Sequence, residues 1–287
     1  ISFVLVLLPF PWHWSARNYG TLLYMAWVSL GCLVYTVDAI IWNGNLSNPA
    51  PVWCDISTKI QIGISIALPA VSLCINRRLY NIATMKHATA TPRERRNQMF
   101  IDLGIGLGIP LLVMALHYVV QGHRYNIVED MGCVPTFYMT PVTVVLILLW
   151  APSLGLISMV YSILSIQAFL RQRRNFRNVL ESNPGCLHTG RFIRLMALAG
   201  VNVLFDVPLS SFVLWSNTRQ GLNPWISWAD THYNFSFIEY VSLDLTQMDR
   251  VAWASLCLSR WVLPFAAFLF FIFFGFSADA VEGYKTI

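Results

Sequence analysis

Five ionisable side chains lie within or at the edges of long apolar stretches of this sequence: Asp38, Lys59, His117, Asp206 and Arg260. A charge inside an apolar helix is costly in lipid, and it commonly marks a functional site with a partner nearby. Asp38 and Lys59 lie at similar depths in adjacent stretches, and so do Asp206 and Arg260. We therefore predict two interhelical ion pairs, Asp38–Lys59 and Asp206–Arg260. Such pairs either act as switches or only hold helices together, and the sequence leaves both readings open.

Two prolines stand next to the deeper pair. Pro208 follows Asp206, and Pro264 follows Arg260. Because a proline within a helix removes a backbone hydrogen bond and permits a bend, each position is a candidate hinge that the pair could lock. The alternative is that these prolines have no special role, since proline is frequent in membrane helices.

The composition points to a membrane protein. Of 287 residues, 56% are hydrophobic and only 11% are charged, whereas soluble domains carry about 25% charged residues. The net charge is +5, and the basic residues are concentrated in particular loops, as described below. We therefore expect no nucleic-acid partner.

The apolar stretches predict an all-α integral membrane protein, with one seven-helix transmembrane domain over residues 1–287. A span needs about twenty residues to cross the hydrocarbon. The expected spans are about 1–11 (incomplete), 19–43, 53–76, 98–120, 138–170, 192–216 and 250–275. We expect the N-terminal run to be a first span with its beginning missing, and the cytoplasmic tail to be absent.

Basic residues predict the orientation. They concentrate in the segments after the third and fifth spans, whereas the other loops carry few. By the positive-inside rule these segments are cytoplasmic, so the N-terminus lies outside and the C-terminus inside. The candidate contacts for a cytoplasmic partner are Arg77, Arg78, Arg173, Arg174, Arg191 and Arg194. The alternative is that these arginines only set the topology.

Two cysteines fall on the predicted outer side. Cys54 begins the third span, and Cys133 lies in the loop after the fourth. Disulfides persist outside the cell, so we predict a Cys54–Cys133 bond, the alternative being two free thiols. The sequons at Asn45 and Asn234 also fall in outer loops, which agrees with this orientation.

Catalytic and metal-binding patterns are missing from the sequence. It contains no HExxH or GxSxG motif, and its histidines are scattered. We expect no metal, no cofactor and no enzymatic activity. The remaining classes are a signal receptor and, as the alternative, a transporter or channel whose pore the charges line.

Several long segments resemble the fungal a-factor-type mating pheromone receptors. They include PVWCDISTKIQIGISIALPAVSLCINRRLY, MALHYVVQGHRYNIVEDMGCVP and NPWISWADTHYNFSFIEYV, and shorter ones are LLPFPWHWSARNYGTL and RLMALA. The chain looks most like the mushroom-type branch, whose members are class D G-protein-coupled receptors. The resemblance implies a plasma-membrane receptor for a farnesylated, carboxymethylated peptide pheromone. It also implies signalling through Gα of a heterotrimeric G protein, contact with membrane lipid, and a homodimer as an assembly state.

The resemblance further implies a ligand site among polar and aromatic residues on the outer side. The candidates are Asp38, Trp53, Lys59, His117, Phe137, Tyr138, Trp215, Trp225, Trp228, His232 and Tyr240. The segment NPWISWADTHYNF is expected to form a lid over this site. Acidic residues near it could steer a basic peptide. The alternative for any one aromatic residue is an interfacial aromatic belt.

Overall fold

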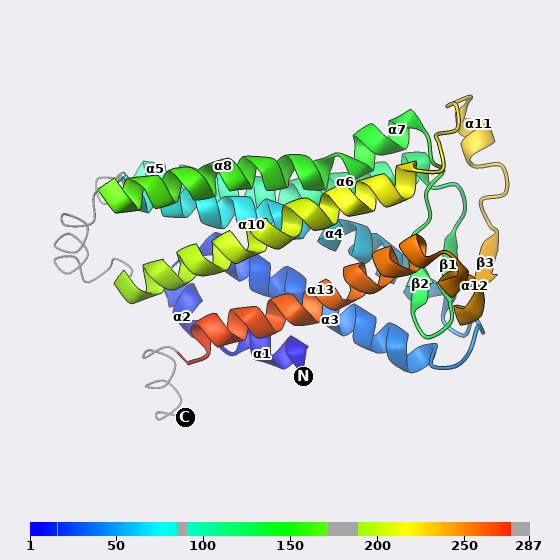
Figure 1. The fold of residues 1–287 in the computed structure, drawn as a ribbon, viewed down its shortest axis with the longest axis horizontal. Coiled ribbons are helices and arrows are strands. Elements are labelled where there is room, and N and C mark those ends of the chain that lie inside the picture. Colours follow the sequence, from blue (N-terminus) through cyan, green and yellow to red (C-terminus); the bar gives the residue numbers. More distant parts are fainter. Residues whose placement is uncertain (16, 85–90, 172–188, 277–287) are drawn as a thin grey trace.

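The computed structural model describes residues 1–15, 17–84, 91–171 and 189–276. Long helices run side by side along the longest axis of the molecule (Figure 1). Short strands and helices collect at one end, which we call the sheet end. The opposite end carries Arg17, Arg93, Arg95, Arg96 and Arg171 as exposed side chains, and we call it the basic end.

Six helices of the described chain are long and apolar enough to cross a membrane. They are α3 (Tyr19–Ile41), α4 (Pro51–Ala83), α5 (Pro92–Leu103) with η1 (Gly104–Gly108) and α6 (Ile109–Val120), α8 (Trp150–Arg171), α10 (Thr189–Thr218) from Ile193 on, and α13 (Arg250–Phe274). The short α7 (Pro141–Thr143) and η2 (Val144–Leu148) precede α8. Successive helices alternate in direction between the two ends (Figure 1).

The expected first span, residues 1–11, is not one helix. Its residues form α1 (Ser2–Leu7) and the start of α2 (Phe10–Ser15), with a break at Leu8 and Pro9. Pro9 has no N–H to donate to the carbonyl of Leu5, so the helical hydrogen bonds are interrupted at the break. α1 nevertheless packs against α3 and α13, and Val6 is fully buried.

The central helix of the bundle is α4. It packs against α3, α6, α8 and α10, and 72% of its apolar window is buried, against 22–50% for the other five spans. Small side chains such as Gly63, Ala67 and Ala70 let its neighbours approach closely, as is usual between membrane helices.

The outward faces of the helices are apolar. Exposed side chains on three different helices include Leu111, Val160 and Ile272, at 48%, 52% and 59% exposure. A soluble bundle places polar residues there, so this distribution fits lipid contact.

A π-helical turn occupies the GIGLG segment. Pro110 has no N–H, so it cannot donate to the carbonyl of Gly106, four residues earlier. The indole Nε1 of Trp27 donates to that carbonyl instead, at 2.9 Å. Gly106 also lies so close to α3 that a Cβ there would come within 2.8 Å of Leu23. Gly106 therefore allows close packing, whereas Gly104 and Gly108, which have the small-xxx-small spacing, meet no neighbouring helix.

The expectation of an all-α fold is wrong in one respect. The loops of the sheet end form a three-stranded sheet of order β2-β1-β3, from β1 (Tyr125–Val128), β2 (Gly132–Val134) and β3 (Ile238–Val241). β1 and β2 form an antiparallel hairpin, with Ile127 opposite Cys133, and β3 pairs with β1 in parallel, with Ile127 opposite Tyr240. The short helices α11 (Trp228–Thr231) and α12 (Leu243–Met248) flank β3. Local patterns did not reveal this sheet, since β1 and β3 lie about a hundred residues apart and the strands are shorter than the usual 5–6 residues.

Gly132 has the tightest backbone position in the hairpin. Its φ is +83°, and a Cβ there would lie 2.8 Å from Cβ of Asp38, an atom close to the α3 backbone. We predict that Gly132→Ala destabilises the folded protein by clearly more than the ~1–2 kcal/mol of left-handed strain alone.

Thermal unfolding of the detergent-purified protein tests this expectation. Gly44→Ala is the matched control, because Gly44 has a φ of +63° and no atom within 4 Å of the added Cβ. Equal losses for the two variants would show that the hairpin does not press against α3.

Candidate functional site

The hairpin is covalently attached to the central helix. Cys54, in the first turn of α4, is bonded to Cys133 of β2, with their Cα atoms 5.3 Å apart. Both cysteines are buried. The predicted disulfide is confirmed, and it fixes the β1–β2 hairpin over the end of the bundle.

Asp38 does not pair with Lys59, so this predicted ion pair is wrong. Its carboxylate accepts a hydrogen bond from Nε1 of Trp53 at 2.6 Å and a longer one from Gln61 at 3.4 Å. Gln61 also donates to the carbonyl of Cys133 at 2.8 Å. Depth in the bilayer matched Asp38 on α3 with Lys59 on α4, but the Lys59 side chain points toward His117 and Gln121 instead of toward α3.

The predicted pair between Asp206 and Arg260 is also absent from the described residues. The Arg260 guanidinium donates instead to the carbonyl of Met131, at the tip of the hairpin, at 2.8 Å, and to the carbonyl of Tyr35 at 3.4 Å. It also lies 5.8 Å from the centre of the Tyr35 ring. The hairpin tip reaches α13 and supplies the acceptor, which counting residues along the helices could not show.

Asp206 lies in a different part of the bundle. It lines a small cavity between α3, α4, α10 and α13, together with Tyr24, Asn202 and several apolar side chains. Pro208 and Pro264 lie inside α10 and α13, both of which continue past them as helices.

Lys59 faces α6. Its ammonium donates to Nδ1 of His117 at 2.8 Å and to Oε1 of Gln121 at 2.7 Å. His117 is fully buried, and its Nε2 lies 3.0 Å from the carbonyl of Thr136. The ring of Phe137 meets the His117 imidazole edge to face, with centroids 5.2 Å apart. The sequence named Lys59, His117 and Phe137, and the structure brings all three together.

An aromatic cluster covers this position. The Tyr118 ring lies 5.9 Å from the Lys59 ammonium and packs against the rings of Trp228, His232 and Phe235 at centroid distances of 5.4–5.7 Å. Trp228 and His232 stack at 4.2 Å. Nε2 of His232 also lies 2.9 Å from the carbonyl of Tyr118. We call Tyr118, Trp228, His232 and Phe235 the aromatic lid; Tyr118 was missed from the sequence because it lies on a lipid-facing helix.

The other predicted ligand residues lie around this group. The Tyr138 hydroxyl donates to Asp230 at 3.4 Å, and Trp225 packs with the apolar residues between α4, α6 and η2. Trp53 belongs to the Asp38 network. Trp215 and Tyr240 are 54% and 50% exposed, and no contact with the lid is found for either among the described residues.

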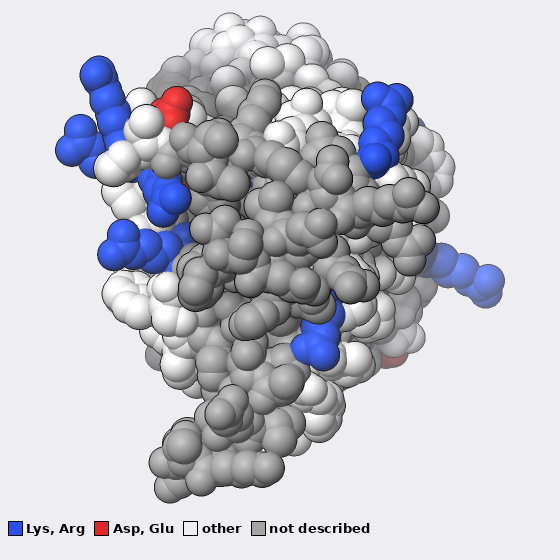
Figure 2. Space-filling model, turned by 90° about the vertical axis from the view of Figure 1, so that its left-hand side faces the viewer, with Lys and Arg blue, Asp and Glu red and all other residues white. Residues whose placement is uncertain are grey.

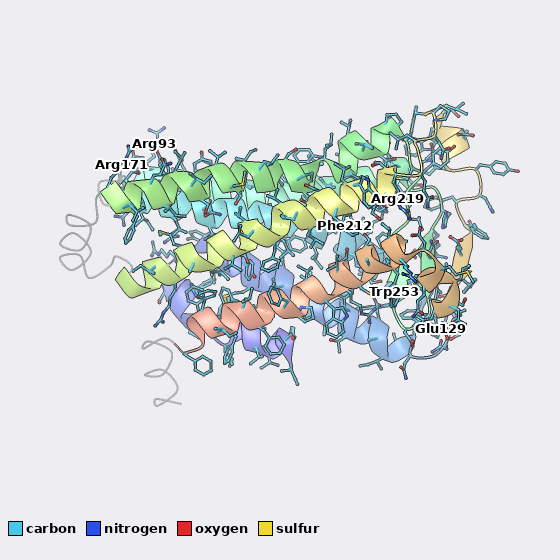
Figure 3. The ribbon with its side chains drawn as sticks, in the orientation of Figure 1. Arg93, Glu129, Arg171, Phe212, Arg219 and Trp253 are labelled. Atoms are coloured by element: carbon cyan, nitrogen blue, oxygen red, sulfur yellow. A yellow bond between two sulfur atoms is a disulfide. The ribbon has the colours of Figure 1, made fainter. Side chains whose placement is uncertain are left out.

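Ion pairs brace the rim of the sheet end. Arg124 forms two hydrogen bonds to the Asp55 carboxylate, at 2.9 and 2.6 Å, which raise the pKa of the guanidinium. Arg219 pairs with Asp249, the N-cap of α13, whose pKa is lowered by hydrogen bonds from the amides of Ala252 and Val251 and by Arg219. Figure 3 labels Arg219 at this end, together with Glu129, whose carboxylate accepts from the amide of Leu243 at 3.0 Å. These contacts join the ends of α10, α13 and the sheet.

The opposite end is strongly basic. Lys and Arg side chains surround it, with few acidic ones (Figure 2). Among the predicted partner contacts, Arg77 forms a salt bridge of 2.7 Å with the buried Asp102, and Arg78 donates to the carbonyl of Arg17 at 2.6 Å. Arg194 is half-buried on α10. Arg173 and Arg174 lie outside the described residues, as does the side chain of Arg191.

The described part of the chain holds no group of three or more His, Cys, Asp or Glu side chains arranged to bind a metal ion. The Lys59 ammonium lies under aromatic rings at the sheet end, and a basic surface lies at the opposite end.

The whole chain, residues 1–287, matches the family model described as "STE3: Pheromone A receptor". It is 42% identical to a protein named Pheromone B alpha 3 receptor from Schizophyllum commune, over all of this chain and 46% of that protein. It is 32% identical to Pheromone receptor 1 from Mycosarcoma maydis, over 99% of this chain and 80% of that protein.

A more distant relative is the Pheromone a factor receptor of Saccharomyces cerevisiae, 26% identical over 99% of this chain and 59% of that protein. The chain spans about half the length of the Schizophyllum relatives that it matches. No solved structure matches it significantly.

The salt bridge between Arg77 and Asp102 is the most buried one in the described chain, with side chains 16% and 6% exposed. We predict that Asp102→Leu alone lowers stability by about 3–5 kcal/mol, because it leaves a buried arginine unpaired, and that Arg77→Met with Asp102→Leu recovers most of the loss.

The midpoint of thermal unfolding measures both effects. Arg219→Gln, which breaks the exposed pair with Asp249, is the control and should cost no more than about 1 kcal/mol. A double variant no more stable than Asp102→Leu would refute this view of the pair.

Proposed function

Because this chain belongs to the STE3 family of pheromone A receptors, we propose that it is the membrane domain of a G-protein-coupled receptor for a farnesylated peptide mating pheromone. The family consists of receptors, not enzymes, and the six membrane-spanning helices fit a multi-pass protein of the plasma membrane. The observation that carries the proposal is the match of the entire chain to this family. The output is the mating response.

We assign the sheet end to the outside and the basic end to the cytosol. The positive-inside rule supports this assignment, as do the disulfide and the sequons at Asn45 and Asn234, all near the sheet end. Residues 1–11 belong to a further span in this proposal, since α1 packs against α3 and α13. The N-terminal side of the bundle then starts outside, and α13 ends inside.

The ligand binds at the sheet end, around Lys59 and under the aromatic lid. A farnesyl group is apolar, and its burial stabilises a complex by about 25 cal/mol per Å². The lid rings, with Phe137 and Trp225 beside them, offer such a surface. Acidic residues near the lid, Asp230, Glu239 and Asp244, attract basic residues of the peptide.

Arg260 transmits the binding event to α13. Its guanidinium joins the hairpin tip to α3 and α13, four residues before Pro264. A ligand that displaces the hairpin changes the contacts of Arg260, and it selects between two arrangements only through its differential affinity for them. Pro264 and Pro208 are the hinges in this proposal, and Asp206 faces the cavity between the two helices that move.

The basic end binds the G protein. Arg194 and the exposed arginines at the start of α5 present positive charge to Gα. Arg173, Arg174 and Arg191 belong to the same proposed surface. Arg77 and Arg78 are engaged within the bundle in this arrangement, so they become available to a partner only when α4 and its neighbours separate.

The proposed activity is tested in a yeast reporter strain that lacks its own pheromone receptors. Farnesylated, carboxymethylated peptides should activate the reporter through this chain, and the same peptides without farnesyl should be at least about a hundredfold weaker, because the apolar contribution is lost. Equal potency of the two peptide forms would contradict a lipopeptide receptor.

Contact between the aromatic lid and the ligand is tested separately. Trp228→Ala removes the ring stacked on His232 and packed against Tyr118, and it should weaken activation about tenfold or more at equal surface expression. Trp215→Ala is the control, since Trp215 is half-exposed and outside the lid, and its dose response should stay within about threefold of the wild type. An unchanged dose response for Trp228→Ala would exclude a lid contact with the ligand.

A further inference from the structure

Lys59 carries a positive charge that the described chain does not neutralise. Both of its hydrogen-bond partners, His117 and Gln121, are uncharged acceptors. An ammonium has three N–H donors, so one remains for another acceptor. No carboxylate of the described residues lies within salt-bridge distance of Lys59.

The carboxylates of Asp55 and Asp38 are engaged elsewhere. Asp55, the acidic residue whose charge acts on Lys59, accepts two hydrogen bonds from Arg124 at 2.9 and 2.6 Å. Asp38 accepts from Trp53 and Gln61. The local charge around Lys59 therefore remains positive.

The two acceptors of Lys59 are held in place by bonds of their own. Nε2 of His117 donates to the carbonyl of Thr136, which leaves Nδ1 as the acceptor that faces Lys59. Nε2 of Gln121 donates to the carbonyl of Arg124 at 2.6 Å, which turns Oε1 toward the ammonium. This arrangement fixes the ammonium below the Tyr118 ring before any ligand arrives.

We infer that Lys59 binds a carboxylate of the peptide ligand, from an Asp or Glu side chain. The inference rests on the proposed function. His117 and Gln121 already supply neutral acceptors to the Lys59 ammonium, and its charge remains without a counter-ion. A neutral ester or backbone carbonyl of the ligand would not neutralise that charge. A charge-assisted hydrogen bond in this partly buried position is stronger than one between neutral groups. Lys59 would thus set ligand specificity, while the aromatic lid holds the apolar group.

The test uses a yeast reporter strain that secretes a library of farnesylated, carboxymethylated peptides. Activating sequences are then compared as pairs in which each Asp or Glu is changed to Asn or Gln. At one acidic position the change should lower potency on the wild-type receptor at least about tenfold, and on Lys59→Gln it should have no effect. Arg219→Gln, which removes an exposed cation of the same end that already has a partner, should keep the wild-type discrimination.

A second measurement needs no variant. Carbodiimide coupling of an activating peptide to the wild-type receptor should join its carboxylate to Nζ of Lys59 as an amide, identified by peptide mapping. Activation by peptides without any required acid, equal discrimination by Lys59→Gln, or coupling only at other lysines would each overturn the inference while the receptor function stands. If no farnesylated peptide activates the wild type, the proposed function fails first, and this inference fails with it.

Discussion

The rest of the structure depends on the attachment of the β1–β2 hairpin to the bundle. A disulfide joins it to the first turn of α4, and hydrogen bonds from Gln61 and Arg260 hold its tip and its second strand. The amide of Asp130 also bonds the carbonyl of Trp42, at the end of α3. The hairpin thereby contacts three spans, α3, α4 and α13, and β3 joins it from the loop between α10 and α13.

The central helix α4 connects the two ends physically. Near the sheet end it holds Cys54, Asp55 and Lys59, and at the basic end it holds Arg77, bonded to Asp102. Between them it is lined with small buried residues, so its neighbours pack closely and a shift at one end is resisted along its length. α4 thus connects the proposed ligand surface physically with the proposed partner surface.

The sequence predicted what depends on composition and local pattern, and missed what depends on side-chain direction. Apolar runs located the long helices, and the outer position of two cysteines predicted the Cys54–Cys133 bond. Depth alone paired Asp38 with Lys59 and Asp206 with Arg260, and both pairings are wrong because neutral acceptors, His117 for Lys59 and the Met131 carbonyl for Arg260, lie closer. The sheet was missed because its parallel strands come from distant loops, and Asp102 because it follows a polar segment.

Arg260 on α13 holds the hairpin in place through its hydrogen bond to the Met131 carbonyl. Hydrogen exchange of the purified receptor, followed by mass spectrometry of residues 125–134, measures it directly. We predict that Arg260→Gln speeds exchange in this segment, whose amides bond to β3 and to the end of α3, while the disulfide remains intact. Exchange as slow as in the wild type would contradict the claim.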